Sequence, residues 1–278
     1  MRGRPAGSHG SAYARYMLDD SRYLDVLAHD IAVLSALETD ALDAPVPACP
    51  EWTVTDLLAH VGRVYHRLDA VLTKGADFAP LDRWLPTPSG GDAVPWFRST
   101  AASLLATLRA ADPEAVVPFW AGPSPTRIWF RRMAQETSIH RVDAQQAVAA
   151  AIGGAEPGPI LPDVALDGID ELFTLFVPRL PAERWDGLAV AAAESDGHAL
   201  VDGEASIHLH CTDVEGEWML RFNHAGLTVA NEHAKGDVAA RGDAGTMNLV
   251  LWNRHPGSTL DCFGTTAVLD RFLAVAHF

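Results

Sequence analysis

The chain has 278 residues, of which 48% are hydrophobic, and its formal net charge is -15. At roughly 150 residues per domain this length favours two domains, and the apolar fraction is ample for two cores. The acidic balance argues against a nucleic-acid partner, because phosphate binding needs clusters of Lys and Arg that this chain does not show. The three cysteines, Cys49, Cys211 and Cys262, include no C-x-x-C pair, which argues against a disulfide framework or a thiolate zinc cage. We therefore expect a cytoplasmic protein in a reducing compartment.

The N-terminal segment, residues 1–17, contains arginines but no continuous apolar core. This composition is not typical of a signal peptide, and we expect a flexible leader. Elsewhere no apolar run approaches the roughly 20 residues that span a bilayer. The sequence therefore predicts no membrane partner.

The first half of the chain is predicted to form helices joined by proline-rich loops. Apolar residues recur at spacings of three and four between about Asp19 and Leu42, which is typical of one face of an amphipathic helix. Three prolines follow, and Thr53 or Thr55 can then cap a second helix whose inward stripe includes His60. The same periodicity predicts further helices at about Val94–Ala111, Thr126–Ala151 and Pro162–Val177. The first four helices can form a bundle, with the fifth leading out of it.

The pattern changes after residue 181, where apolar and polar residues begin to alternate with the period of half-buried strands. Strands at Ile207–Cys211 and Trp218–Phe222 are predicted to form a hairpin, because Gly216 lies in the turn between them. Further elements are predicted at Gly226–Ala230 and Asp237–Arg241 (strands), Thr246–Arg254 (helix), Thr259–Phe263 (strand) and Thr266–Val275 (helix). This half is therefore predicted to be a small α/β domain, and the domain boundary is expected between residues 154 and 184.

Three polar side chains on the inward faces of the predicted helices are candidate metal ligands. Residues four apart on an α-helix lie on one face with Cβ atoms about 5–6 Å apart, so Glu136 and His140 can reach one ion. His60, on the second helix, would complete three protein ligands. Such a set suits zinc with an exchangeable fourth position, as in catalytic sites, and nickel and iron are alternatives. A Glu-x-x-x-His pair alone is more often a surface ion pair, but an unpaired carboxylate on an inward face would become protonated or cost several kcal/mol.

A family resemblance rests on two segments, CPEWTVTDLLAHVG from Cys49 to Gly62 and ETSIHRVDA from Glu136 to Ala144. Both resemble the mycothiol-dependent maleylpyruvate isomerase family, and the similarity continues through IHLHCTD at residues 207–213, GEW at 216–218 and LVLWNR at 249–254. The resemblance implies an α + α/β fold. Its parts would be a DinB-like metal-binding four-helix bundle at residues 18–178 and a sterol-carrier-like α/β domain at residues 184–278. It also implies that the zinc ligands are His60, Glu136 and His140.

The resemblance implies zinc and mycothiol as cofactors, and the metal indicates the chemistry. A low-molecular-weight thiol that enters the open coordination position would be deprotonated by the cation, and the resulting thiolate is the nucleophile. It would act on an electrophilic small molecule, either by S-transfer or by cis-trans isomerisation through reversible addition. We rank transfer slightly ahead, because the isomerase is one narrow member of a broad family. The alternative is a non-catalytic small-ligand-binding protein with a structural metal site. The active cleft is expected where the domains meet, and no oligomeric state is predicted.

Three further charged residues are candidates for supporting roles. Arg254 is the best match to an arginine that the family uses in its reaction, and it could clamp a carboxylate of the substrate or the thiol bidentately. A salt bridge between domains is an equal alternative for Arg254. Asp143 could orient a ligand imidazole, although pairing with Arg141 or a neighbouring helix ranks ahead. Asp56 is expected to cap the start of the second helix.

Other histidines and aromatic residues receive simpler interpretations. His208 and His210 mimic a His-x-His metal pair on one face of a strand, but the resemblance explains this sequence as part of the C-terminal sheet. The other histidines after the leader, including His233, have no partner at ligand spacing. Trp52 is expected to be a core anchor at the helix entrance. The long loop Ala76–Asp92, which contains a tryptophan, could shape a pocket for a bulkier substrate.

Overall fold

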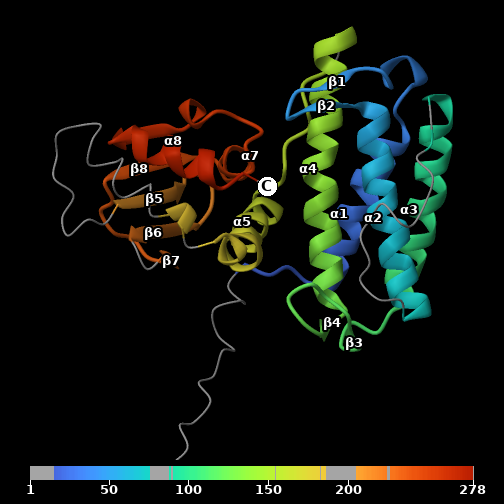
Figure 1. Cartoon of the computed structure of the whole chain (residues 1–278), viewed down its shortest axis with the longest axis horizontal. Coiled ribbons are helices and arrows are strands. Elements are labelled where there is room, and N and C mark those ends of the chain that lie inside the picture. The colour runs from blue at the N-terminus through green and yellow to red at the C-terminus, as the bar shows by residue number, and fades with distance from the viewer. Residues whose placement is uncertain are drawn as a thin grey trace, which may run out of the picture. The chain divides into compact units, whose positions relative to one another are not determined.

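The computed structural model (Figure 1) describes residues 16–75, 88, 90–153, 155–181, 183–185, 205–223 and 226–277. These residues form two compact units. One is a helical unit, Leu18–Pro159. The other contains the described residues from Ile160 onward, together with Tyr16 and Met17. Most of the expected leader and most of the expected pocket loop, residues 76–87 and 89, lie outside the described residues. No helix among the described residues is long and apolar enough to cross a membrane.

The helical unit confirms the predicted bundle. Its long helices are α1 (Asp20–Ser35), α2 (Val54–Lys74), α3 (Ala93–Ala110) and α4 (Arg127–Ile152). Helix α1 packs against α3 and α4, and α2 packs against α3 and α4 (Figure 1). The apolar stripes of the sequence fill the centre of this unit, with Leu27, Leu58, Tyr65, Phe97 and Trp129 almost fully buried.

Helix α1 ends earlier than its periodicity predicted. It stops at Ser35 and gives way to a short 3-10 turn, Thr39–Ala41. The stripe of buried residues within the helix ends at Leu34, and the next buried residues are Ala41 and Leu42, in and after the 3-10 turn, so residues 35–38 gain little burial against the bundle. Without such burial, the modest helix propensity of the following Thr and Asp is not enough to continue the helix.

Two short hairpins of the helical unit were not predicted. Strand β1 (Pro45–Val46) pairs antiparallel with β2 (Cys49–Thr53), and β3 (Val116–Val117) pairs antiparallel with β4 (Ser124–Pro125). These strands are too short to show an alternating pattern, and the prolines in them favour a loop interpretation. The first hairpin contacts both α2 and α4, and it leads directly into the N-terminus of α2.

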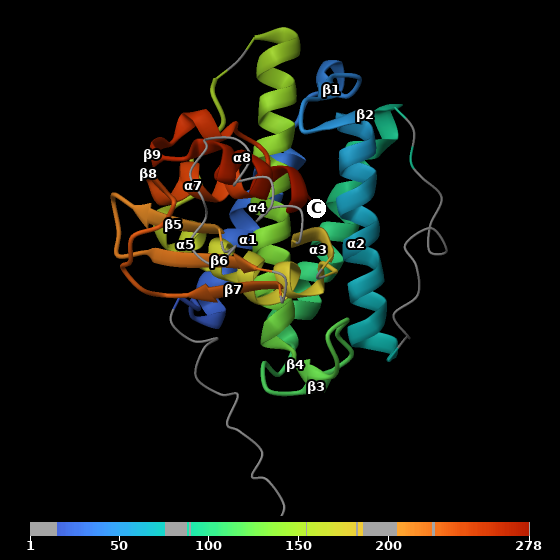
Figure 2. The same ribbon diagram turned by 60° about the vertical axis from the view of Figure 1, so that its left-hand side comes forward.

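The C-terminal unit is built on a five-stranded sheet of order β7–β6–β5–β8–β9. Its strands are β5 (Ala205–Cys211), β6 (Glu217–Asn223), β7 (Gly226–Ala230), β8 (Val238–Gly242) and β9 (Asp261–Gly264), all near their predicted positions. Strands β5 and β8 run parallel, and the other pairs of neighbouring strands are antiparallel (Figure 2). Helix α7 (Ala244–Leu251) and helix α8 (Thr266–Val275) complete the α/β architecture. The predicted fold class is thus confirmed.

One face of this sheet forms the core of the unit. Helix α8 packs against β5 and β8, and its Phe272 lies 5.7 Å, ring centre to ring centre, from Phe222 of β6. By strand alternation and register, Ile207 and Leu209 of β5 share the face of Phe222. His208 and His210 therefore lie on the opposite face.

Helix α5 (Pro162–Glu171) belongs to the C-terminal unit rather than to the bundle, because it packs against α7. The units divide at Pro159, inside the boundary range of residues 154–184 expected from the sequence, although the expected bundle range of residues 18–178 included this helix. The α-helix is also shorter than predicted. A π-helical turn, Leu172–Phe176, follows it, and a 3-10 turn begins at Val177, where Pro178 cannot donate the hydrogen bond that an α-helix needs.

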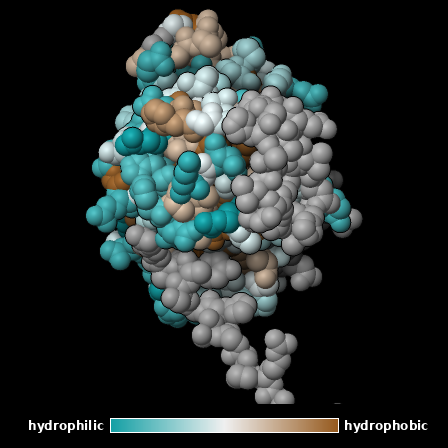
Figure 3. All heavy atoms as spheres, turned by 90° about the vertical axis from the view of Figure 1, so that its left-hand side faces the viewer, coloured by the Kyte–Doolittle hydropathy of each residue, from teal (hydrophilic) through white to brown (hydrophobic). Residues whose placement is uncertain are grey.

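The described residues on one face of the molecule are mostly polar. In the view of Figure 3, hydrophilic residues predominate among those coloured, and apolar ones are scattered between them. Among the described residues, the large exposed hydrophobic side chains are Val116, Ile152, Leu161 and Phe263. Such isolated apolar residues are ordinary on a protein surface.

Candidate metal centre

The three predicted ligands lie on two helices of the bundle. His60 is in the second turn of α2, and Glu136 and His140 are one turn apart in α4. The start of α2 is fixed by a capping box in which the Thr53 hydroxyl accepts from the backbone N–H of Asp56, while the Asp56 carboxylate accepts from that of Thr53. This confirms the capping role expected for Asp56. The cap sets the rotation of the first turns of α2, and with it the direction of His60.

The three side chains converge on one point. Glu136 Oε1 lies 3.3 Å from His60 Nε2 and 3.3 Å from His140 Nε2. One ligand atom from each residue lies within 4.8 Å of the other two. The side chains of His60 and Glu136 are 22% and 20% exposed, and that of His140 is 10% exposed. The cluster is therefore largely desolvated, with a small part of each side chain still exposed.

Two buried charged residues contact Glu136 and His140 on the side away from His60. Arg132, one turn before Glu136 on α4, donates a hydrogen bond from Nη2 to Glu136 Oε2 at 2.8 Å. Asp143 Oδ2 lies 3.0 Å from His140 Nδ1 and is fully buried. These contacts leave Glu136 Oε1 and His140 Nε2 pointing toward His60. A carboxylate on the far nitrogen of an imidazole is the usual outer partner of a metal-ligating histidine.

The pKa values of the site follow from these contacts. Burial by itself raises the pKa of Glu136, but hydrogen bonds with His140 and His60 and the charge of Arg132 hold it well below its usual value. Burial lowers the pKa of His140, yet hydrogen bonds with Asp143 and Glu136 outweigh this effect and raise it to about 9. Glu136 is therefore a carboxylate at neutral pH. A proton and a metal ion would compete for the same lone pair of His140 Nε2.

The donor set fits a divalent metal ion. Two imidazole nitrogens and one carboxylate oxygen are ligands typical of catalytic zinc sites, which keep a fourth position for water or substrate. His60 of α2 reaches the pair of Glu136 and His140 on α4, so that donor atoms from two helices converge on one point, as an ion between them requires. The three residues thus suit the metal that the family resemblance implied.

Trp52 forms one wall of the cluster, a position that its expected role as a core anchor did not indicate. Its ring centre lies 4.9 Å from that of His60 and 6.3 Å from that of His140. The side chain is half-buried rather than enclosed in the core. Strand β2 carries it to this place, so the short hairpin before α2 helps to form the site.

Family models match both parts of the chain. The Mycothiol maleylpyruvate isomerase N-terminal domain matches residues 27–145, and the MDMPI C-terminal domain matches residues 163–271. The chain belongs to the mycothiol maleylpyruvate isomerase family. The resemblance drawn from the two segments of the sequence is therefore confirmed, and the N-terminal match contains all three residues of the cluster.

Two solved structures are similar to this member of the mycothiol maleylpyruvate isomerase family. One is the mycothiol-dependent maleylpyruvate isomerase, with a TM-score of 0.54 and 14% sequence identity, and the other is a histidine-to-alanine variant of that isomerase, with a TM-score of 0.55 and 13% identity. Both alignments cover 88% of this chain and 93% of the other. At such identities the similarity shows a shared fold. Among curated proteins, no sequence matches the chain.

The other candidate residues of this family member have separate surroundings. Asp143 contacts His140, as expected of a residue that orients a ligand imidazole, and Arg141 pairs with Asp30 of α1 at 2.9 Å. Arg254 follows α7 in the C-terminal unit and donates from Nη1 to the backbone oxygen of Trp252 at 2.7 Å. Its role in the reaction remains a prediction.

Two residues of the site escaped sequence reasoning. Arg132 stands four residues before Glu136, so the i,i+4 rule that paired Glu136 with His140 could also have found it. Trp52 reaches the imidazoles only through the docking of β2 on the bundle, which no periodicity in the sequence reports. The structure also joins His208 and His210 to other side chains of the C-terminal unit, as described below.

Proposed function

We propose that the protein is a metal-dependent enzyme that uses a low-molecular-weight thiol, mycothiol, to isomerise an electrophilic cis double bond of a small acid. The observation that carries the proposal is the convergence of His60, Glu136 and His140 inside the matched N-terminal domain. Membership of the isomerase family favours isomerisation over the S-transfer that the sequence ranked ahead.

In this proposal His60, Glu136 and His140 hold a divalent ion, with zinc the best fit to their donor types. When bound, the ion lowers the pKa of a thiol at its open position and so supplies a thiolate at neutral pH. Asp143 keeps the proton of His140 on Nδ1, so that the Nε2 lone pair faces the ion. Arg132 fixes Glu136 through Oε2, and together with His140 and His60 it holds the pKa of Glu136 well below its usual value.

The overall reaction leaves the thiol unchanged. The thiol sulfur adds to one carbon of the double bond and a proton ends on its neighbour or on the conjugated carbonyl, so that a single bond joins the two carbons. Rotation about that bond and loss of the sulfur and the proton give the trans product and the starting thiol. Trp52 covers one side of the cluster and would limit the access of water to the reacting thiol. Arg254 is proposed to hold a carboxylate of the substrate or the thiol.

The test is an assay with mycothiol and maleylpyruvate, a cis-unsaturated acid, in which trans product and free thiol are both measured. We expect turnover only with thiol present, and no loss of thiol when the reaction is complete. Consumption of one thiol per product would instead show transfer.

The Glu136→Gln variant distinguishes the enzyme hypothesis from that of a non-catalytic binding protein. It should reduce turnover at least about 100-fold, because it removes the anionic ligand. The matched control is Glu156→Gln, since Glu156 is exposed and lies outside the cluster. Full turnover in Glu136→Gln would refute the proposal.

A further inference from the structure

A second cluster of potential metal ligands lies in the C-terminal unit. His208 and His210 are two residues apart on β5 and therefore share the face of the sheet opposite α8. Glu217 stands directly across from His210 in the antiparallel pairing of β5 with β6. His233 follows the end of β7. The sequence interpretation had given His233 no partner, and the structure corrects this, because β7 returns the chain beside Glu217.

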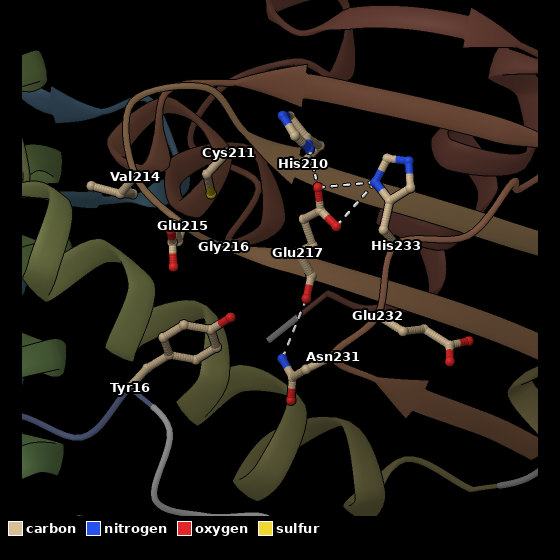
Figure 4. Close-up of a pocket in the computed structure, with 10 residues that line it drawn as sticks. All are labelled: Tyr16, His210, Cys211, Val214, Glu215, Gly216, Glu217, Asn231, Glu232 and His233. Atoms are coloured by element: carbon tan, nitrogen blue, oxygen red, sulfur yellow. Dashed lines mark hydrogen bonds and ion pairs between the residues drawn. The ribbon is translucent and has the colours of Figure 1, made fainter.

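Three imidazoles surround the carboxylate of Glu217, and Figure 4 shows those of His210 and His233. Glu217 Oε1 lies 2.5 Å from His210 Nδ1, and both oxygens of Glu217 lie 3.1 Å from His233 Nδ1. His208 Nε2 is 3.8 Å from Glu217 Oε2. One ligand atom from each of the four residues lies within 4.8 Å of the other three. Three imidazoles and one carboxylate thus converge from three separate segments.

His208 points to a missing ligand in this cluster. The residue is only 6% exposed, and its Nε2 has no hydrogen-bond partner among the described residues. A buried imidazole nitrogen needs either a hydrogen bond or a metal ion, and the cluster in front of it offers the partners of a metal ion.

The cavity beside the cluster favours a cation. It has a volume of about 400 Å³, and three carboxylates, Glu215, Glu217 and Glu232, are among the ten residues that line it. No lysine or arginine is among these ten (Figure 4). Arg221 of β6 pairs with one of these carboxylates, Glu232, at 2.6 Å, and by strand register Arg241 stands across from His210 on β8. Its side chain is exposed and can extend into solvent.

We propose that His208, His210, Glu217 and His233 bind one divalent transition-metal ion of the zinc class, at a site separate from that of the bundle. Imidazole and carboxylate donors suit such ions, and four protein ligands without an open position are typical of structural zinc sites. The ion would tie the β5–β6 hairpin to the segment after β7. This inference does not depend on the proposed enzymatic activity.

The test measures cobalt and zinc binding in a protein that lacks the bundle site. In full-length His60→Ala/His140→Ala, we expect about one equivalent of Co²⁺ to bind, with the visible ligand-field bands of a four-coordinate ion, and zinc to displace it. Adding His233→Ala should weaken binding at least about tenfold. The His233 side chain is 76% exposed, so this change is compatible with folding. The matched control is His277→Ala, an exposed histidine of the same unit outside the cluster.

The proposal is overturned if the double variant binds no stoichiometric metal, or if His233→Ala and His277→Ala bind it equally well. Should the double variant fail to fold, the zinc content of the otherwise unchanged chain decides. There His233→Ala is expected to remove about one equivalent and His277→Ala none. Hydrogen exchange gives a further readout, because a structural ion should slow the exchange of backbone amides in the segment around His233 when zinc is added.

Discussion

Asp143 and Arg132 are single buried charges beside the proposed metal site. Each contacts a proposed ligand on the side away from the cluster, Asp143 through His140 Nδ1 and Arg132 through Glu136 Oε2. Each therefore determines which ligand atom faces the centre. Neither would touch the ion, so their substitution should change its affinity more than the fold.

For Asp143, we expect Asp143→Asn to weaken zinc binding at the bundle site by about 10–100-fold, because the amide no longer accepts a strong hydrogen bond from the imidazole. Competition with a chromophoric chelator measures this affinity. Asp25→Asn, an exposed change on α1, should leave it unaltered. Equal affinities for the two variants would mean that Asp143 has no part in orienting His140.

The proposed role of Arg254 in binding a carboxylate can also be tested with a single substitution. If it clamps a carboxylate bidentately, Arg254→Lys should reduce kcat/KM at least about tenfold, since a lysine cannot form the paired hydrogen bonds. Steady-state kinetics with varied thiol and varied acid would show which of the two it contacts. Arg271→Lys in the same unit is the control, and unchanged constants for Arg254→Lys are incompatible with a clamp.

Among the elements, the contact of α2 with α3 depends on a glycine. A Cβ atom on Gly62, one turn or less from His60, would lie 2.1 Å from a ring carbon of Trp96 on α3. Glycine therefore allows the two helices to pack closely beside the site. In the sequence this glycine was only the last residue of a family-like segment, and the structure supplies its physical reason.

Gly62→Ala is accordingly expected to destabilise the protein by about 1–3 kcal/mol, because the ring of Trp96 must move. Chemical denaturation of the helical signal measures the change. Gly91→Ala is a matched control, since nothing lies within 4 Å of a Cβ atom there and changes at such sites stay within about 0.5 kcal/mol. A Gly62→Ala variant as stable as the control would contradict this account of the helix contact.

The helices and the larger strands could be predicted because their buried apolar residues recur at regular spacings along the chain. The convergence of Glu136 and His140 follows from the same helical periodicity, and the family resemblance added His60. Features that depend on tertiary contact were missed. Trp52 approaches His60 through a hairpin too short for any pattern, and His233 lies in a segment after β7 whose position depends on the whole sheet.

The enzyme hypothesis gives the metal a catalytic role, whereas the binding-protein hypothesis gives it a structural role in the whole protein. The bundle has an extensive apolar core of its own, so the metal of an active site is expected to contribute little to its folding. Glu136→Gln should then keep its helical circular dichroism and lose only a few degrees in Tm, while turnover is lost. A structural metal predicts the reverse, with large unfolding in this variant and in zinc-depleted protein.

Metal content shows whether His60, Glu136 and His140 hold a metal ion, as proposed. Inductively coupled plasma mass spectrometry on protein purified without an affinity tag would compare the unaltered chain with His140→Ala and with His277→Ala. We predict that His140→Ala contains about one equivalent of zinc less than the other two proteins. Equal metal content in all three, or none in any, would contradict the claim.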